Sequence, residues 1–182
     1  DRATKLLTYI AKTSIQGHPE IKNQNKPNTT PFTFRNNKKS KEESSSTNLK
    51  KILGNEGADE VRSWALDQNQ LLLTDTTMRD GHQSLLATRM RSIDMLAVAD
   101  RYNGNLGELF SVECWGGATF DVAYRFLQEC PWQRLRDLRA KMPDTLLQML
   151  LRGSNGVCYT NYPDNYVKYF VTLAAKSGID IF

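Results

Sequence analysis

Short apolar runs alternate with amphipathic stretches over the second part of the chain. The apolar runs lie at 70–75, 109–114, 146–151 and 178–182. Between them, apolar residues recur at the three- and four-residue spacing of helices that bury one face. Strands that alternate with helices indicate parallel strands joined by crossovers, so the pattern predicts an α/β fold.

Four helices are expected between and after these strands. Ser92 and Thr119 are candidate N-caps, and Pro131 and Pro163 suit the start of a helix. Gly178 is expected to end the last helix. The residues expected to face inward are Ile93, Leu96, Ala97 and Tyr102, then Phe120, Ala123, Phe126 and Leu127, then Leu135, Leu138 and Met142, and finally Val167, Phe170, Val171 and Ala174.

The spacing of the expected strands is nearly constant. The strands start at Leu71, Leu109, Leu146 and Ile179, which are separated by 38, 37 and 33 residues. Such a step is typical of a (β/α)8 TIM barrel, although a doubly wound sheet also fits it. Because eight units need about 250 residues, we expect an incomplete barrel of three to four βα units, cut from a larger protein.

The first part of the chain has a different character. Apolar residues at 6, 7, 10 and 11 predict a helix within residues 1–13. Residues 21–48 are rich in Asn, Lys, Ser and Thr and predict a flexible linker. Residues 21–51 carry a net charge of +6 and the rest of the chain −2, so the total of +4 gives little reason to expect nucleic-acid binding. No apolar run reaches 18 residues, so no membrane span is expected.

The three cysteines give little chemistry. Cys114, Cys130 and Cys158 are far apart and form no metal-binding spacing. A sparse, odd count indicates a reducing compartment, and each cysteine is expected to be a buried, inert thiol.

Polar residues follow the expected strands, where the chemistry of a barrel gathers. The segment "TDTTMRDGHQS" supplies Asp75, Arg79, Asp80, His82 and Gln83 after the first strand. Glu113 ends the second strand, and Arg152 follows the third. Carboxylate, guanidinium and amide groups at one edge indicate a site for a small anion, a hard metal ion, or both.

Each of these residues also has a structural explanation. Asp80 is as well explained by pairing with Arg79 as by metal binding. His82 is expected to make a structural hydrogen bond, and Arg152 could be a solvated surface residue. Asp121 lies in the first turn of a helix, where the helix dipole favours it. Asp75 is expected to be structural, and the glycines of "WGG" to serve tight turning.

Long sequence blocks over residues 60–182 point to a family. They are "LLTDTTMRDGHQSLLATRMRS", "LFSVECWGGATFDVAYRFLQECPWQRLRDLR", "LLQMLLRGSNGVCYTNYPDN" and "GIDIF". The region resembles the first part of the carboxyltransferase domain of biotin-dependent pyruvate carboxylases. The oxaloacetate decarboxylase alpha subunit and the carboxyl-acceptor subunit of transcarboxylase share that barrel and remain alternatives, although "YTNYPDN" is more similar to the pyruvate carboxylases. Gly81 departs from the alanine usual there.

The resemblance implies a reaction and a set of partners. The carboxyl group of carboxybiotin passes to pyruvate and gives oxaloacetate, a step of anaplerosis and gluconeogenesis. Biotin, ATP and bicarbonate belong to other domains, and a divalent metal (Mn, Zn or Mg) lies in the barrel. A tetramer in the cytoplasm, or in the mitochondrial matrix of a eukaryote, is expected. The site residues carried over are Asp80 for the metal, Arg79, Gln83 and Arg152 for pyruvate and its chemistry, and Asp121 and Tyr159 for biotin.

The resemblance also predicts the domain limits. Residues 1–20 would end a biotin carboxylase domain, 21–52 would be a linker, and 53–182 would begin the carboxyltransferase barrel. Three of the four implied metal ligands are absent from the chain, so we expect it to be inactive and to bind metal poorly by itself. A non-catalytic fragment or an interaction module using the basic linker are the other interpretations.

Overall fold

The computed structural model describes residues 4–5, 8–9, 47–106 and 108–182 of the 182-residue chain. The chain divides into two units, 1–31 and 32–182. In the first unit, residues 4–5 and 8–9 are helical. The apolar positions of the expected first helix, and residues 21–46 of the expected linker, lie outside the described residues.

A parallel sheet forms the centre of the second unit. Its strands are β1 (Thr74–Asp75), β2 (Ser111–Gly116) and β3 (Leu147–Leu150), in the order β1-β2-β3. Both strand pairs are parallel. A parallel bridge between Gln148 and Ile181 adds the start of a further strand beside β3. The parallel α/β class is therefore confirmed, whereas closure into an eight-stranded barrel stays a prediction.

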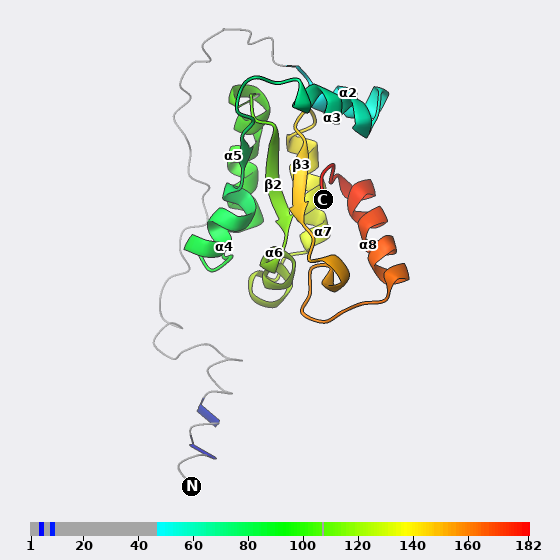
Figure 1. The fold of residues 1–182 in the computed structure, drawn as a ribbon. Helices are drawn as coiled ribbons and strands as arrows, with labels where there is room; N and C mark the ends of the chain where they lie inside the picture. Colours follow the sequence, from blue (N-terminus) through cyan, green and yellow to red (C-terminus); the bar gives the residue numbers. More distant parts are fainter. Residues whose placement is uncertain (1–3, 6–7, 10–46, 107) are drawn as a thin grey trace. The chain divides into compact units, whose positions relative to one another are not determined.

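Helices connect the strands and lie beside the sheet and at both of its ends (Figure 1). The long helices beside the strands are α5 (Ser92–Asn105), α7 (Pro131–Lys141) and α8 (Asp164–Ser177). At the carboxyl ends of the strands lie the π-helix η1 (Thr77–Gly81), α4 (His82–Leu85), α6 (Ala118–Val122), the π-helix η2 (Ala123–Leu127) and the short 3-10 helix η3 (Gly153–Asn155). At the opposite end lie α2 (Leu49–Asn55) and α3 (Ala58–Leu66).

The core lies between the sheet and the long helices, and Trp115 is at its centre. The indole packs on Trp132, Phe120 and Phe170 at centroid distances of 4.8, 5.6 and 5.9 Å. Its Nε1 donates to the Pro131 carbonyl at 3.0 Å, so the buried polar group is satisfied. Strand β2 is thereby fixed against α6, α7 and α8.

Strand β2 has a bulge between Glu113 and Trp115. Glu113 is paired with Gln148 and Trp115 with Met149, so Cys114 is the extra residue. Residues two positions apart in a regular strand share a face. Here Glu113 instead contacts Arg79 of η1, whereas Trp115 packs among the helices.

The predicted helix faces are confirmed for two helices and only partly for a third. In α7 and α8, Leu135, Leu138, Phe170 and Ala174 are buried as expected. In α5, however, Ile93 and Ala97 are exposed, and the buried residues are Met95, Ala99 and Tyr102. Of the predicted residues, Tyr102 is therefore buried as expected and Leu96 packs against the core, while Met95 and Ala99 take the buried positions expected for Ile93 and Ala97.

Gly178 ends α8 as predicted, but the two predicted N-caps, Ser92 and Thr119, and one predicted core residue are wrong. Arg91, and not Ser92, occupies the N-cap of α5, because the Ser92 amide and hydroxyl donate to Glu129. Gly117 holds that position in α6, and Thr119 is buried two residues further along. Phe126 is exposed, with the Arg89 guanidinium 4.1 Å from its ring centroid.

Two predicted boundaries differ from the structure: the length of the first strand and the end of the linker. The strand expected at 70–75 shortens to two residues, and Leu71 is 85% exposed. Helix α2 begins at Leu49, before the predicted linker end at residue 52. Leu49 is buried with Val61 and Leu146, so α2 is packed on the amino end of β3.

The thiols differ from one another. Cys114 is buried, and burial raises its pKa to about 12, so the prediction of an inert thiol is confirmed there. Cys130 is exposed, which contradicts the prediction, because its side chain lies at the surface before α7. Among the described residues, no helix is long and apolar enough to cross a membrane.

Candidate active site

The segment after β1 is held in place by Asp75. Its Oδ1 accepts from the Thr77 amide at 3.0 Å and the Tyr102 hydroxyl at 3.1 Å, and its Oδ2 accepts from the Thr77 hydroxyl at 3.0 Å. Burial and the Asp75 carboxylate raise the pKa of Tyr102 to about 12, so the phenol stays a donor. The prediction that Asp75 is structural is confirmed. The chain then enters the π-helix η1, a conformation that is frequent at functional sites.

Arg79 binds two carboxylates. Its Nη1 donates to Asp80 Oδ1 at 3.0 Å, and its Nη2 donates to Glu113 Oε2 at 2.8 Å. The side chains of Arg79 and Glu113 are 12% and 6% exposed, whereas that of Asp80 is 51% exposed. Arg79 Nε is buried without a hydrogen-bond partner. One guanidinium and two carboxylates leave the cluster with a formal charge of −1.

Gln83 lies against the glycine turn that ends β2. Its Oε1 accepts from the Ala118 amide at 3.2 Å, which leaves the Nε2 hydrogens to donate elsewhere. A Cβ on Gly117 would lie 3.1 Å from Gln83 Oε1 and 3.8 Å from Arg79 Cδ, so Gly117 makes room for both side chains. A Cβ on Gly116 would lie 2.2 Å from the Leu150 carbonyl oxygen, and both glycines have positive φ. The predicted role of "WGG" in tight turning is confirmed.

Arg152 follows β3 at the same edge of the sheet. Its amide donates to the Gly156 carbonyl at 2.8 Å and closes the turn that contains η3. Its guanidinium carbon lies 5.4 Å from the centroid of the Tyr159 ring, which is exposed. Within the described part of the chain, no carboxylate pairs with Arg152, so its charge is available for an anion.

Asp121 has a local partner. Arg125, one turn along, donates from Nε to Asp121 Oδ1 at 2.7 Å, as helix neighbours at this spacing do. No hydrogen bond or ion pair joins Asp121 to Arg79, Gln83 or Arg152. Arg79, Asp80 and Gln83 are thus brought together, Arg152 and Tyr159 form a second group, and Asp121 lies on a third element.

His82 makes no side-chain hydrogen bond of good geometry, although the Met78 main chain lies close enough to act on its ring. Its ring is buried, and neither nitrogen has a hydrogen-bond partner. Burial lowers the pKa of His82, and the nearby Arg134 and Arg79 charges act in the same direction, while the Met78 main chain opposes them. The neutral ring is therefore favoured.

Two residues were underrated by the sequence pattern. Glu113 was noted only as the end of a strand, but it is the buried partner of Arg79. Thr119, expected as a cap, carries a buried hydroxyl without a partner. Most of the buried polar atoms found without partners among the described residues lie on η1, α4 and α6. Such groups are rare in native proteins and often mark functional sites.

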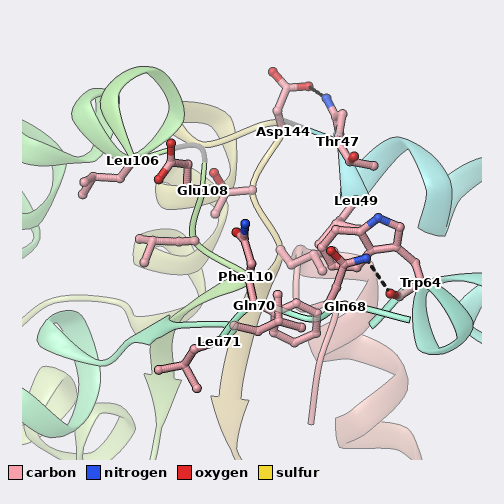
Figure 2. Close-up of a pocket in the computed structure, with 15 residues that line it drawn as sticks. Thr47, Leu49, Trp64, Gln68, Gln70, Leu71, Leu106, Glu108, Phe110 and Asp144 are labelled. Atoms are coloured by element: carbon pink, nitrogen blue, oxygen red, sulfur yellow. Dashed lines mark hydrogen bonds between the residues drawn. The ribbon is translucent and has the colours of Figure 1, made fainter. Parts of the chain in front are cut away.

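A pocket of about 480 Å³ lies at the other end of the sheet (Figure 2). Trp64, Gln68, Leu71, Phe110 and Asp144 are among its lining residues. In barrels, that end contributes stability, and chemistry takes place at the carboxyl ends of the strands. The pocket is therefore not part of the candidate site.

The described residues do not form a complete metal site. No group of three or more His, Cys, Asp or Glu side chains is placed to hold an ion among them. Asp80 offers one half-exposed carboxylate, already bonded to Arg79 through Oδ1. Divalent cations take several oxygen or nitrogen ligands, so this donor set does not fit a metal by itself.

Comparison with known proteins defines the class. No protein-family model matches the chain. The carboxyltransferase domain of Rhizobium etli pyruvate carboxylase, solved with pyruvate and biocytin, is 53% identical with a TM-score of 0.77, and the match covers 100% of this chain and 30% of that one. A Rhizobium etli pyruvate carboxylase variant with the allosteric activator acetyl coenzyme-A gives the same identity and TM-score, over 100% of this chain and 16% of that one. The fold is that of part of a carboxyltransferase domain.

The similar curated proteins are pyruvate carboxylases. Pyruvate carboxylase of Bacillus subtilis is 52% identical over 183 residues, which cover 100% of this chain and 16% of the relative. The mitochondrial pyruvate carboxylase of Rattus norvegicus is 53% identical over 131 residues, 72% of this chain and 11% of the relative. The chain is a homologue of the pyruvate carboxylases and spans about a sixth of the length of the Bacillus subtilis relative.

Proposed function

We propose that the chain is part of a biotin-dependent pyruvate carboxylase and forms one rim of its carboxyltransferase site. The observation that carries the proposal is the meeting of Arg79 and Gln83 at Gly117, with Asp80 bonded to Arg79, in a chain about half identical to the Bacillus subtilis pyruvate carboxylase over its whole length. A similar structure, the Rhizobium etli carboxyltransferase domain, was solved with pyruvate and biocytin, which supports the choice of substrate. The rest of an eight-stranded barrel is expected to supply the other rim.

Arg152 is the proposed anchor of the pyruvate carboxylate. Its guanidinium is not neutralised by a described carboxylate, and a planar fork can bind a carboxylate through two parallel hydrogen bonds. Arg79 and the Gln83 Nε2 amide are then proposed to face the keto oxygen. When the methyl carbon loses its proton, negative charge develops on that oxygen, and fixed donors stabilise it most where water is excluded.

Asp80 is proposed as a metal ligand only in combination with further ligands. Its Oδ2 has no contact with Arg79, and half of the side chain is open. Three further donors would have to come from other residues of the whole protein, so no step of the reaction is assigned to the metal here. ATP and bicarbonate are likewise proposed to act on another domain.

Asp121 and Tyr159 are proposed to contact biotin, which carries the carboxyl group to be transferred. Both lie at the carboxyl end of the sheet, on α6 and on the loop after β3. The Tyr159 ring is exposed, and Asp121 is held by Arg125. The ring can therefore face an incoming ligand on one side while Arg152 lies near it.

The remaining expectations concern the whole protein. We propose the carboxylation of pyruvate to oxaloacetate, a homo-oligomer, and a location in the cytoplasm, or in mitochondria as in the Rattus norvegicus relative. Residues 1–20 as the end of a biotin carboxylase domain, and 21–52 as a linker, stay proposals of the same kind.

The test is oxaloacetate formation by the full-length protein that contains this chain. Activity should require ATP, bicarbonate and covalent biotin. Arg152→Ala and Asp80→Ala should each abolish carboxyl transfer while leaving the ATP-dependent carboxylation of biotin intact, because that step belongs to another domain. Decarboxylation of oxaloacetate coupled to sodium, without ATP, would instead identify a decarboxylase. Full transfer activity in both variants would refute the site.

A further inference from the structure

Glu113 gives Arg79 its one buried ionic partner. The Nη2–Oε2 distance is 2.8 Å, and both side chains are largely buried. The other partner, Asp80, is adjacent in sequence and half exposed. A buried ion pair with good geometry fixes two side chains far more firmly than an exposed one, whose partners exchange with water. The orientation of Arg79 is therefore set chiefly by Glu113.

The two residues come from elements of different rigidity. Glu113 lies on β2, the middle strand, whose residues are all buried and which pairs with a neighbour on each side. Arg79 lies on the short π-helix η1. A long arginine side chain on such an element has many rotamers, and its Nε makes no hydrogen bond that would select one. The strand can select it through Glu113.

We propose that Glu113 is a positioning residue of the carboxyltransferase site, which holds the Arg79 guanidinium toward an α-keto acid. The proposal rests on the proposed function. Glu113 acts through Arg79 and does not itself touch the substrate. Because its charge offsets that of Arg79, it also leaves Arg152 as the uncompensated cation for the substrate carboxylate.

A double-mutant cycle in the full-length protein tests this role. Glu113→Gln keeps the shape and an acceptor oxygen but removes the charge. It should lower kcat/KM for pyruvate by about 10- to 100-fold, as small displacements of a reacting group do. Arg79→Met should lower it at least as much. The Arg79→Met/Glu113→Gln double variant should match Arg79→Met within about twofold, because Glu113 has nothing left to position.

Glu129→Gln is the matched control. Glu129 accepts from the buried Arg134 at 2.6 Å, between α7 and the start of α5, and has no contact with Arg79 or Gln83. The Glu129→Gln substitution should reduce stability. Any factor by which it lowers kcat/KM should multiply with the factor for Arg79→Met. If the effects of Glu113→Gln and Arg79→Met multiply in the same way, Glu113 is merely structural and the proposal is overturned. Unchanged kcat/KM in Glu113→Gln overturns it too.

A crystal structure of the Glu113→Gln protein gives a readout that does not depend on activity. The Arg79 guanidinium should leave its position beside β2 or become disordered, and an unmoved Arg79 overturns the proposal. If the parent protein makes no oxaloacetate yet Arg79 moves, the proposed function fails and the positioning role stands. If Glu113→Gln does not fold, Glu113→Asp, which withdraws the carboxylate by one methylene, is used in both tests with the same expectations.

Discussion

Arg139 and Arg79 are both mostly buried arginines bonded to acidic residues, but they use their donors differently. Arg139, on α7, has a partner at every nitrogen. Nε donates to the Gly178 carbonyl at 3.1 Å, Nη1 to the Met142 carbonyl at 2.9 Å, and Nη2 to Asp180 Oδ2 at 2.5 Å. Arg79 has two carboxylate partners and a buried Nε without any.

The difference separates a structural role from a functional one. Asp180 also accepts from Lys50 Nζ and from the Leu147 amide, so the Arg139 cluster joins α2, α7 and the amino end of β3. Its donors are used up by the protein itself. The Arg79 cluster, at the carboxyl end of β1, keeps donors unused and one carboxylate half open. Such incomplete satisfaction is what a binding site needs before its ligand arrives.

The largest expected loss of stability follows from breaking the Arg139 cluster. Asp180→Asn leaves two buried or half-buried cations without their 4%-exposed partner. The free energy of unfolding should fall by about 3–5 kcal/mol. Chemical denaturation measures it, with Asp100→Asn as the control, because the Asp100–Lys141 pair is exposed and should contribute about 0–1 kcal/mol. Equal losses in the two variants would contradict the comparison.

A smaller loss is expected from Gly178→Ala. Gly178 has φ +126°, and an added Cβ would lie 2.8 Å from Arg139 Cβ, which cannot swing away as a side-chain tip could. We expect a destabilisation of about 1–3 kcal/mol. Gly54→Ala is the matched control: Gly54 is inside α2 with nothing within 4 Å of its added Cβ. That variant should be more stable by about 0.5–1 kcal/mol, so the thermal midpoints should move in opposite directions.

A third arginine, Arg134, is paired with Glu129, and the stabilisation that this pair gives should depend on pH. Burial acts to raise the pKa of its partner Glu129, but hydrogen bonds from Ser92 and Arg134 outweigh this and lower it from 4.5. The unfolded chain therefore takes up the proton first, and the stabilisation is present above about pH 4.5 and lost as the pH falls toward the lowered pKa. The stability difference between the parent and Glu129→Gln should shrink over that window. A constant difference from pH 7 to pH 3 would contradict it.

The smallest change in stability is expected for Asp80→Asn. Because Asp80 is half exposed, its pair with Arg79 should contribute only about 0–1 kcal/mol. The same variant should nevertheless abolish carboxyl transfer in the full-length protein, if Asp80 binds the metal. Denaturation and transfer assays on one preparation measure both. A large loss of stability would mean that Asp80, like Asp180, stabilises the fold.

Local pattern predicted much of this fold. The alternation of strands and helices, the starts of α7 and α8 and their buried faces are visible in the sequence because each depends on neighbouring residues. The buried face of α5 was predicted only in part, at Leu96 and Tyr102, since two apolar stripes compete in its sequence. The sheet selects Met95 and Ala99, while Tyr102 donates to Asp75.

The candidate site was only partly visible for a similar reason. Arg79, Asp80 and Gln83 are close in sequence, and the family resemblance marked them. The Arg79–Glu113 pair joins residues 34 positions apart, and no local pattern encodes it. His82 shows the opposite error, because a histidine in a polar segment suggests a hydrogen bond, whereas burial left its ring without one.

The bulge in β2 lets one short strand contact both the candidate site and the hydrophobic core. In a regular strand without the bulge, the side chains at 113 and 115 would lie on the same face of the sheet, and a larger side chain at one position would crowd the other. With the bulge, Glu113, which binds Arg79, and Trp115, which packs on the helices, can each be altered separately. Evolution or an engineer could therefore vary the chemistry at this edge of the sheet while the hydrophobic interior stays intact.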